Sequence, residues 1–126
     1  MSVRFKTIEL DFIRLDLFED YIIATVHEGV LMDIQKIEVL HEAYIPYYPN
    51  KKFGYIDNRV NDYTINLSPD LYNIRYQGMT GLAVVCYTEL AYRNSLFEKS
   101  FYNWPFDSFQ TLEEAILWIE ELKEAD

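Results

Sequence analysis

The chain has 126 residues, half of which are apolar, and it contains only four Gly and four Pro. This composition excludes a disordered or fibrous chain, and the length suits one domain that buries a core without disulfides or metals. The formal net charge of −10 makes binding to nucleic-acid phosphates or to anionic lipid headgroups unfavourable.

Residues 82–86 form an apolar run that includes Cys86, the only cysteine. A single cysteine forms no internal disulfide, and in such a run we expect a buried, unreactive thiol. No apolar run approaches the roughly 20 residues that span a bilayer. Residues 1–5 also lack the long apolar segment of a secretory signal. We therefore expect a cytoplasmic protein that does not insert into membranes.

The first elements are predicted to be strands. Apolar residues alternate weakly along residues 5–12, and the phase of this alternation changes near Phe12. Because side chains alternate between the two faces of a strand, the phase change predicts a bulge or bend. Residues 12–18 and 21–27, with a tight turn between them, are predicted to form an antiparallel hairpin.

A helix is predicted after Asp33, whose side-chain oxygen can cap the first turn. Apolar residues recur at helical spacing as far as Tyr44, and Pro46 should end the helix there. A short buried strand over residues 53–57 comes next, and residues 61–67 are predicted to be an ordered loop.

Ser68, Pro69 and Asp70 are predicted to start a short helix that reaches about Tyr76. A hydroxyl cap, a proline at the first helical position and an acid in the first turn together favour a helix start. Residues 81–87 are the most apolar strand, which favours a central position in a parallel sheet.

The last third of the chain is predicted to be helix, strand and helix. Thr88 can cap the first of these helices, in which Leu90, Phe97 and Phe101 lie on one stripe. The other two elements are a short strand over residues 106–109 and a helix from the Thr111 capping box to about Glu124.

Strands and helices alternate along the chain after the N-terminal hairpin. This order predicts an α/β fold with a single mixed sheet of about five strands, in which the hairpin is followed by parallel strands in sequential order. Right-handed crossovers would place the helices mainly on one face. The other face would be thinly covered, or would pair with another subunit. We expect one domain over residues 1–126.

Hydrogen-bonding side chains gather at the carboxyl end of the strand over residues 53–57, where open α/β sheets bind ligands. They are Asp57, Asn58, Arg59, Asn61 and Tyr63. Arg59 is suited to clamp a carboxylate or phosphate, Asp57 or Asn61 to orient the ligand, and Tyr63 to stack on an apolar part. The alternative is a network in which these side chains bond to one another and make the loop rigid.

His27 and His41 are the only histidines, and no third residue at metal-binding spacing accompanies them. The sequence contains no glycine-rich phosphate loop and no nucleophile elbow. We therefore predict no metal site, no cofactor and no catalytic activity.

Four stretches of the sequence resemble a known family. They are residues 28–30 (Glu-Gly-Val), 53–59 (Phe-Gly-Tyr-Ile-Asp-Asn-Arg), 81–85 (Gly-Leu-Ala-Val-Val) and 111–119 (Thr-Leu-Glu-Glu-Ala-Ile-Leu-Trp-Ile). With the N-terminal hairpin, they are similar to the small STAS-like proteins of Bacteroidetes-type bacteria. These are relatives of anti-sigma-factor antagonists and, more distantly, of CRAL-TRIO domains. The resemblance covers about residues 10–122 and implies a single STAS-like domain.

The resemblance implies a non-enzymatic regulatory domain. In antagonists of the wider family, a serine after the third strand is phosphorylated and controls partner binding. The nearest serine at a helix start in this chain is Ser68, where the helix N-terminus would favour a phosphate. Ser68 also suits a purely structural cap. Asp57, Asn58 and Arg59 stand where the family carries its serine motif, so the phosphorylation mechanism does not transfer directly.

Two functions from different classes follow. The favoured one is a regulatory domain that binds a protein partner or a second copy of itself, with Tyr47, Tyr48 and Tyr63 as contact residues. The alternative is a domain that binds a small anionic or apolar ligand at the polar cluster beyond the strand over residues 53–57.

Overall fold

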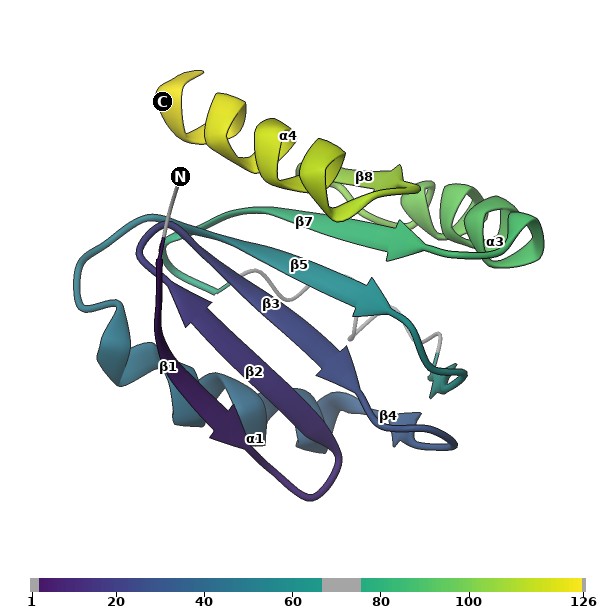
Figure 1. Ribbon diagram of the computed structural model, residues 1–126, viewed down its shortest axis with the longest axis horizontal. Coiled ribbons are helices and arrows are strands. Elements are labelled where there is room, and N and C mark those ends of the chain that lie inside the picture. Colours follow the sequence, from purple (N-terminus) through teal and green to yellow (C-terminus); the bar gives the residue numbers. More distant parts are fainter. Residues whose placement is uncertain (1–2, 67–75, 126) are drawn as a thin grey trace.

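The computed structural model describes residues 3–66 and 76–125, and its main element is a six-stranded sheet (Figure 1). In spatial order the strands are β1 (Arg4–Glu9), β2 (Ile13–Phe18), β3 (Tyr21–Val26), β5 (Phe53–Arg59), β7 (Met79–Cys86) and β8 (Phe106–Phe109). The first three are antiparallel neighbours, and β3, β5, β7 and β8 are parallel. The predicted α/β class, mixed sheet and sequential strand order are confirmed.

The bulge predicted near Phe12 is instead a tight turn between two strands. The Leu10 N–H donates to the Ile13 carbonyl at 2.8 Å, and β1 pairs with β2 as an antiparallel edge strand. Most residues of β1 are exposed, so its apolar alternation is too weak to separate it from β2 in the sequence. Of the two predicted alternatives, the bend is present and the bulge is not, and β1 adds a sixth strand to the sheet.

The first helix begins and ends where the sequence predicts. An Asp33 carboxylate oxygen accepts from the Lys36 N–H at 2.9 Å and caps α1 (Ile34–Tyr44). Pro46 lies in the short 3₁₀ helix η1 (Ile45–Tyr47) that follows directly. Because proline removes a backbone donor, the α-helical ladder stops at this point.

The other two described helices also match their predicted starts. Thr88 caps α3 (Glu89–Lys99), and α4 (Leu112–Ala125) follows β8. The helix predicted over residues 70–76 falls almost wholly outside the described residues, so its prediction is not tested.

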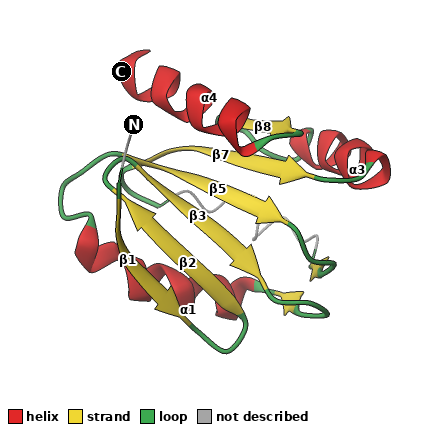
Figure 2. Ribbon diagram, viewed as in Figure 1, coloured by secondary structure: helices red, strands yellow, loops and turns green. Residues whose placement is uncertain are grey.

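A second, two-stranded parallel sheet forms beside the carboxyl ends of β3 and β5 (Figure 2). It pairs β4 (Leu31–Met32) with β6 (Thr64–Ile65). The Gly29 N–H adds a bond to the Asp62 carbonyl at 2.7 Å. These bonds hold the segment after β5 in place, so that the side chains on it have fixed positions.

α1 and α3 lie on one face of the sheet, and α4 lies on the other (Figure 1). Along β7, Val84 and Cys86 pack with α3 residues, whereas Ala83 and Val85 pack with α4 residues. α1 and α3 each join two parallel strands, so right-handed crossovers put them on the same face. No described strand follows α4, so no crossover decides on which face of the sheet it lies. It covers apolar residues that the sheet would otherwise expose.

Two glycines let α4 lie close to the sheet. A Cβ atom at Gly54 would overlap the Ile119 side chain, and one at Gly81 would overlap Leu122. A strand glycine normally weakens a sheet, and here it makes room for a helix.

The antiparallel half of the α4 face is polar. Asp16 on β2 accepts from Arg4 at 3.3 Å, from Thr7 at 3.0 Å and from Arg14 at 3.3 Å. α4 packs mainly on β5, β7 and β8, so the prediction of a thinly covered face holds for this half and is wrong for the parallel half, which α4 covers. The ion pairs of the antiparallel half are exposed, and a solvated surface of this kind does not favour pairing with another subunit.

Candidate functional site

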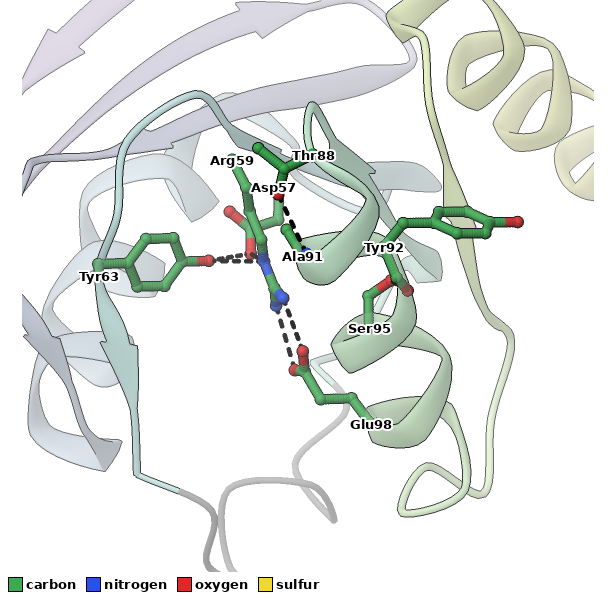
Figure 3. Close-up of polar contacts among 8 residues, drawn as sticks. All are labelled: Asp57, Arg59, Tyr63, Thr88, Ala91, Tyr92, Ser95 and Glu98. Carbon is green, nitrogen blue, oxygen red and sulfur yellow. Dashed lines mark hydrogen bonds and ion pairs between the residues drawn. The ribbon is translucent and has the colours of Figure 1, made fainter.

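Arg59 lies between two carboxylates on the face that α1 and α3 cover (Figure 3). Its Nε donates to Asp57 Oδ2 at 3.0 Å. Its two terminal nitrogens donate to the Glu98 carboxylate at 2.6 and 3.1 Å, a paired arrangement that suits the planar guanidinium. Asp57 and Arg59 are two apart on β5 and therefore share a face. Glu98 comes from α3, so Arg59 joins strand and helix.

Tyr63 completes this network from the segment that follows β5. Its hydroxyl donates to Asp57 Oδ2 and accepts from Arg59 Nε at 3.0 Å. The Tyr63 ring lies 5.6 Å from the guanidinium carbon of Arg59, within range of a cation–π contact. Burial raises the pKa of Tyr63 well above its ordinary value, and the charge of Asp57 raises it further. Tyr63 is therefore a neutral donor at physiological pH.

The network carries a net charge of −1, because two carboxylates share one guanidinium. Only 12% of the Asp57 side chain, 13% of Arg59 and 9% of Glu98 are exposed. Burial alone lowers the pKa of Arg59, but the charge of Asp57, aided by Tyr63 and Glu98, raises it overall. Arg59 therefore stays cationic, and removing it would leave two buried carboxylates without their partner.

A cavity of about 110 Å³ adjoins the network, between the sheet and α1. Aromatic and aliphatic side chains form most of its described lining, which includes Leu40, Tyr44, Tyr55 and Tyr63. Asp57 and Tyr76 also line it. Asp57 Oδ1 and the Tyr76 hydroxyl are both buried and have no hydrogen-bond partner among residues 3–66 and 76–125. Buried polar atoms normally have hydrogen-bond partners, so two such atoms beside one cavity make it a candidate ligand site.

The structure brings three of the five predicted site residues together, Asp57, Arg59 and Tyr63. Asn61 does not join them, because its side-chain amide donates to the Val26 carbonyl at 3.0 Å and ties the loop to β3. Asn58 lies on the other side of β5, where its oxygen accepts from the Tyr87 hydroxyl at 2.5 Å. Ser68, the predicted phosphorylation site, lies outside the described residues.

Glu98 is the network residue that the sequence analysis does not identify. The predicted apolar stripe of α3 suggests the buried side, but Leu90 is 69%, Phe97 64% and Phe101 44% exposed. The helix instead buries Ser95 and Glu98. A buried charge requires an oppositely charged partner. A buried Arg59 would therefore have pointed to an acidic residue elsewhere in the chain, but not to Glu98 in particular.

The histidines have local partners. His27 pairs with Glu9 at 2.9 Å, and His41 contacts the Tyr44 hydroxyl at 3.0 Å and stacks on Tyr76. No group of three His, Cys, Asp or Glu side chains arranged for a metal occurs within residues 3–66 and 76–125.

The single cysteine and one predicted contact residue are buried. Cys86 is 2% exposed, and burial raises the pKa of its thiol, which disfavours the reactive thiolate. Tyr48 is also 2% exposed, and its hydroxyl donates to the Phe18 carbonyl at 2.6 Å. The prediction that Tyr48 contacts a partner is therefore wrong: the tyrosine-rich segment after α1 turns this ring into the core.

Comparisons with protein-family models, with curated proteins and with solved structures found no significant match to this chain. The STAS-like resemblance of the sequence thus stays a prediction. None of the helices in the described part of the chain is long and apolar enough to span a membrane.

Proposed function

We propose that this protein is a non-enzymatic interaction domain that binds another protein through the outward side of α3. The observation behind the proposal is the orientation of this helix. Leu90 and Phe97 on α3 and Phe101, two residues beyond its end, are exposed, while Ser95 and Glu98 are buried. We call these three exposed residues the α3 apolar face.

The α3 apolar face has the composition of a small contact surface. Phe97 and Phe101 lie edge to face with their ring centroids 5.3 Å apart, which makes one patch of two aromatic residues. Burying an exposed Leu or Phe side chain contributes about 1.5–3 kcal/mol. Single exposed apolar residues are ordinary on protein surfaces, but a clustered patch is typical of a binding site.

The charges around this face are paired. Glu89 and Arg93 form an ion pair at 2.6 Å, and Lys99 pairs with Asp107 at 3.4 Å. An apolar centre with a polar rim is typical of a protein interface. Two copies of a chain with a net charge of −10 repel each other, so we favour a different protein as the partner.

The polar network also supports an interaction domain over the alternative of an anion binder. Arg59 would be the clamp for an anionic ligand, but its donors are directed at Asp57, Glu98 and Tyr63. A regulatory role of the STAS-like kind and a cytoplasmic location both fit this proposal and come from the sequence alone.

Affinity capture from the native cell, with light scattering on the purified chain, tests the proposal. The double variant Leu90→Asp/Phe97→Asp should lose a partner that the wild type retains. The matched control is Leu117→Asp, which changes an equally exposed apolar residue on α4, and it should retain the partner. A partner held equally by all three proteins would contradict the proposal, as would a wild-type monomer that captures nothing. A dimer broken only by the double variant would show that a second copy occupies the face.

A further inference from the structure

The cavity beside Asp57 has the chemistry of a ligand site that the α3 apolar face does not involve. We propose that it binds a small organic cation, a protonated amine with a compact apolar body.

The charge of the network favours a cation. Asp57 and Glu98 are both buried and share the single guanidinium of Arg59. A ligand with one positive charge would bring the buried site to neutrality. An anion would meet a net negative site, so the anionic ligand expected from the sequence is disfavoured. In an environment of low dielectric this difference is larger than it would be in water.

One carboxylate oxygen of the network is buried and lacks a hydrogen-bond partner among the described residues. Arg59 and Tyr63 both bond to Asp57 Oδ2, and Oδ1 is buried without a partner in the described part of the chain. Figure 3 shows the second oxygen of Asp57 turned away from Arg59 and Glu98. Asp57 as a whole residue is 9% exposed, and it lines the cavity. An ammonium N–H placed beside Oδ1 would give this oxygen a hydrogen-bond partner.

The walls suit the rest of such a ligand. Tyr44, Tyr55 and Tyr63 line the cavity with aromatic rings, and rings attract a cation through their faces. Burial raises the pKa of all three tyrosines, so the phenols stay neutral. The hydroxyl of Tyr76, which is buried and has no partner within the described residues, supplies a second polar contact.

The volume sets the size of the ligand. A cavity of about 110 Å³ is somewhat smaller than the roughly 150 Å³ cavity that accepts benzene. The site therefore takes an amine with about five or six non-hydrogen atoms. Cyclopentylamine is a suitable probe, and cyclopentanol and cyclobutanecarboxylate are neutral and anionic probes of similar size.

Calorimetric titration of the full chain with the three probes tests the proposal. Cyclopentylamine should bind at least about tenfold more tightly than cyclopentanol, because only the amine pairs with a charge. Cyclobutanecarboxylate should bind most weakly. Equal binding of amine and alcohol would overturn the proposal. So would no binding of any probe, which would leave Asp57 Oδ1 to a buried water.

Two substitutions that each remove one negative charge show whether cyclopentylamine binds beside Asp57. Asp57→Asn should reduce the affinity for cyclopentylamine at least about tenfold. Asp16→Asn is the control, since it removes a carboxylate from the opposite face of the sheet, and it should leave the affinity unchanged. Equal loss in both variants would overturn the proposal, because it would show attraction by the net charge alone.

A measurement on the wild type covers the case in which Asp57→Asn does not fold. The side-chain methyl resonances of Leu40 and Met32, which line the cavity, should shift when cyclopentylamine is added. Tyr76→Phe should weaken the binding by about threefold through loss of one polar contact. Shifts confined to residues outside the cavity would overturn the proposal.

Discussion

α1 and α3 occupy equivalent places in the fold, but only α3 adds a buried ion pair to its apolar contact with the sheet. Each joins two parallel strands, and both cover the same face (Figure 1). α1 buries Leu40 and Tyr44 in the largest apolar cluster of the core. α3 buries Ser95 and Glu98, and it turns its large apolar side chains toward solvent. Position in the fold therefore does not decide which side of a helix faces the sheet.

The difference shows what each contact depends on. Apolar burial is non-directional, so α1 needs only side chains of suitable size. The contact of α3 is directional, because the Arg59 guanidinium and the Glu98 carboxylate meet in one geometry. A buried ion pair adds little net stability and fixes the arrangement of its partners. The orientation of α3 is thus specified by Arg59, which places Leu90 and Phe97 on the exposed side of the helix.

The largest expected effect comes from removing the charge on which α3 depends. Arg59→Met keeps much of the side-chain length and leaves Asp57 and Glu98 buried without a cation. We expect a loss of about 3–5 kcal/mol in the free energy of unfolding, measured by urea denaturation.

A triple variant separates charge from packing. Arg59→Met combined with Asp57→Asn and Glu98→Gln removes every charge of the network, and it should recover most of the lost stability. If the triple variant were as unstable as Arg59→Met alone, the shape of the network rather than its charge would hold α3.

The contact of α1 should respond to volume rather than to charge. Leu40→Ala leaves a void next to the existing cavity, and we expect a loss of about 2–5 kcal/mol in the free energy of unfolding. Leu40→Met, which conserves volume, should cost less than about 1.5 kcal/mol. Urea denaturation of both variants checks this, and equal losses would show that α1 is not held by close packing.

The same contrast separates what the sequence predicts from what it does not. Apolar periodicity and caps place α1, α4 and the parallel strands correctly, since apolar burial dominates there. The predicted stripe of Leu90, Phe97 and Phe101 faces solvent and not the sheet. Apolar periodicity predicts the buried side of a helix only where apolar burial decides the orientation of the helix. Asp57 and Arg59 are found as site residues because they follow a buried strand. Glu98 is 39 residues further along than Arg59, and only the fold brings them together.

The helix caps provide a test with a smaller expected effect. The stability that the cap of α1 contributes should depend on pH, because Asp33 is charged. Accepting the Lys36 N–H lowers the pKa of Asp33, and the Lys36 charge lowers it further. A lowered pKa means that the stabilising effect is present above the unfolded value of about 3.9 and is lost as the pH falls through the folded value. Asp33→Asn keeps a cap without the charge, so its difference from the wild type should narrow as the pH falls from about 5 to about 3.

The cap of α3 is the control for this measurement. Thr88 caps the helix with a neutral hydroxyl that accepts from the Ala91 N–H at 3.1 Å. The difference in urea midpoint between Thr88→Ser and the wild type should therefore not change over the same pH range. A pH-independent difference for Asp33→Asn as well would show that the charge of Asp33 contributes nothing to α1.

The smallest expected effect is on the outward side of α3. Phe97→Asn replaces a large aromatic side chain that is 64% exposed, and we expect the free energy of unfolding to change by less than about 0.5 kcal/mol. A loss above about 1 kcal/mol that grows with protein concentration would mean that Phe97 is buried between copies in solution. An unchanged free energy of unfolding would fit the partner contact that we propose for the α3 apolar face. The same substitution should therefore weaken partner capture while leaving the unfolding curve unchanged.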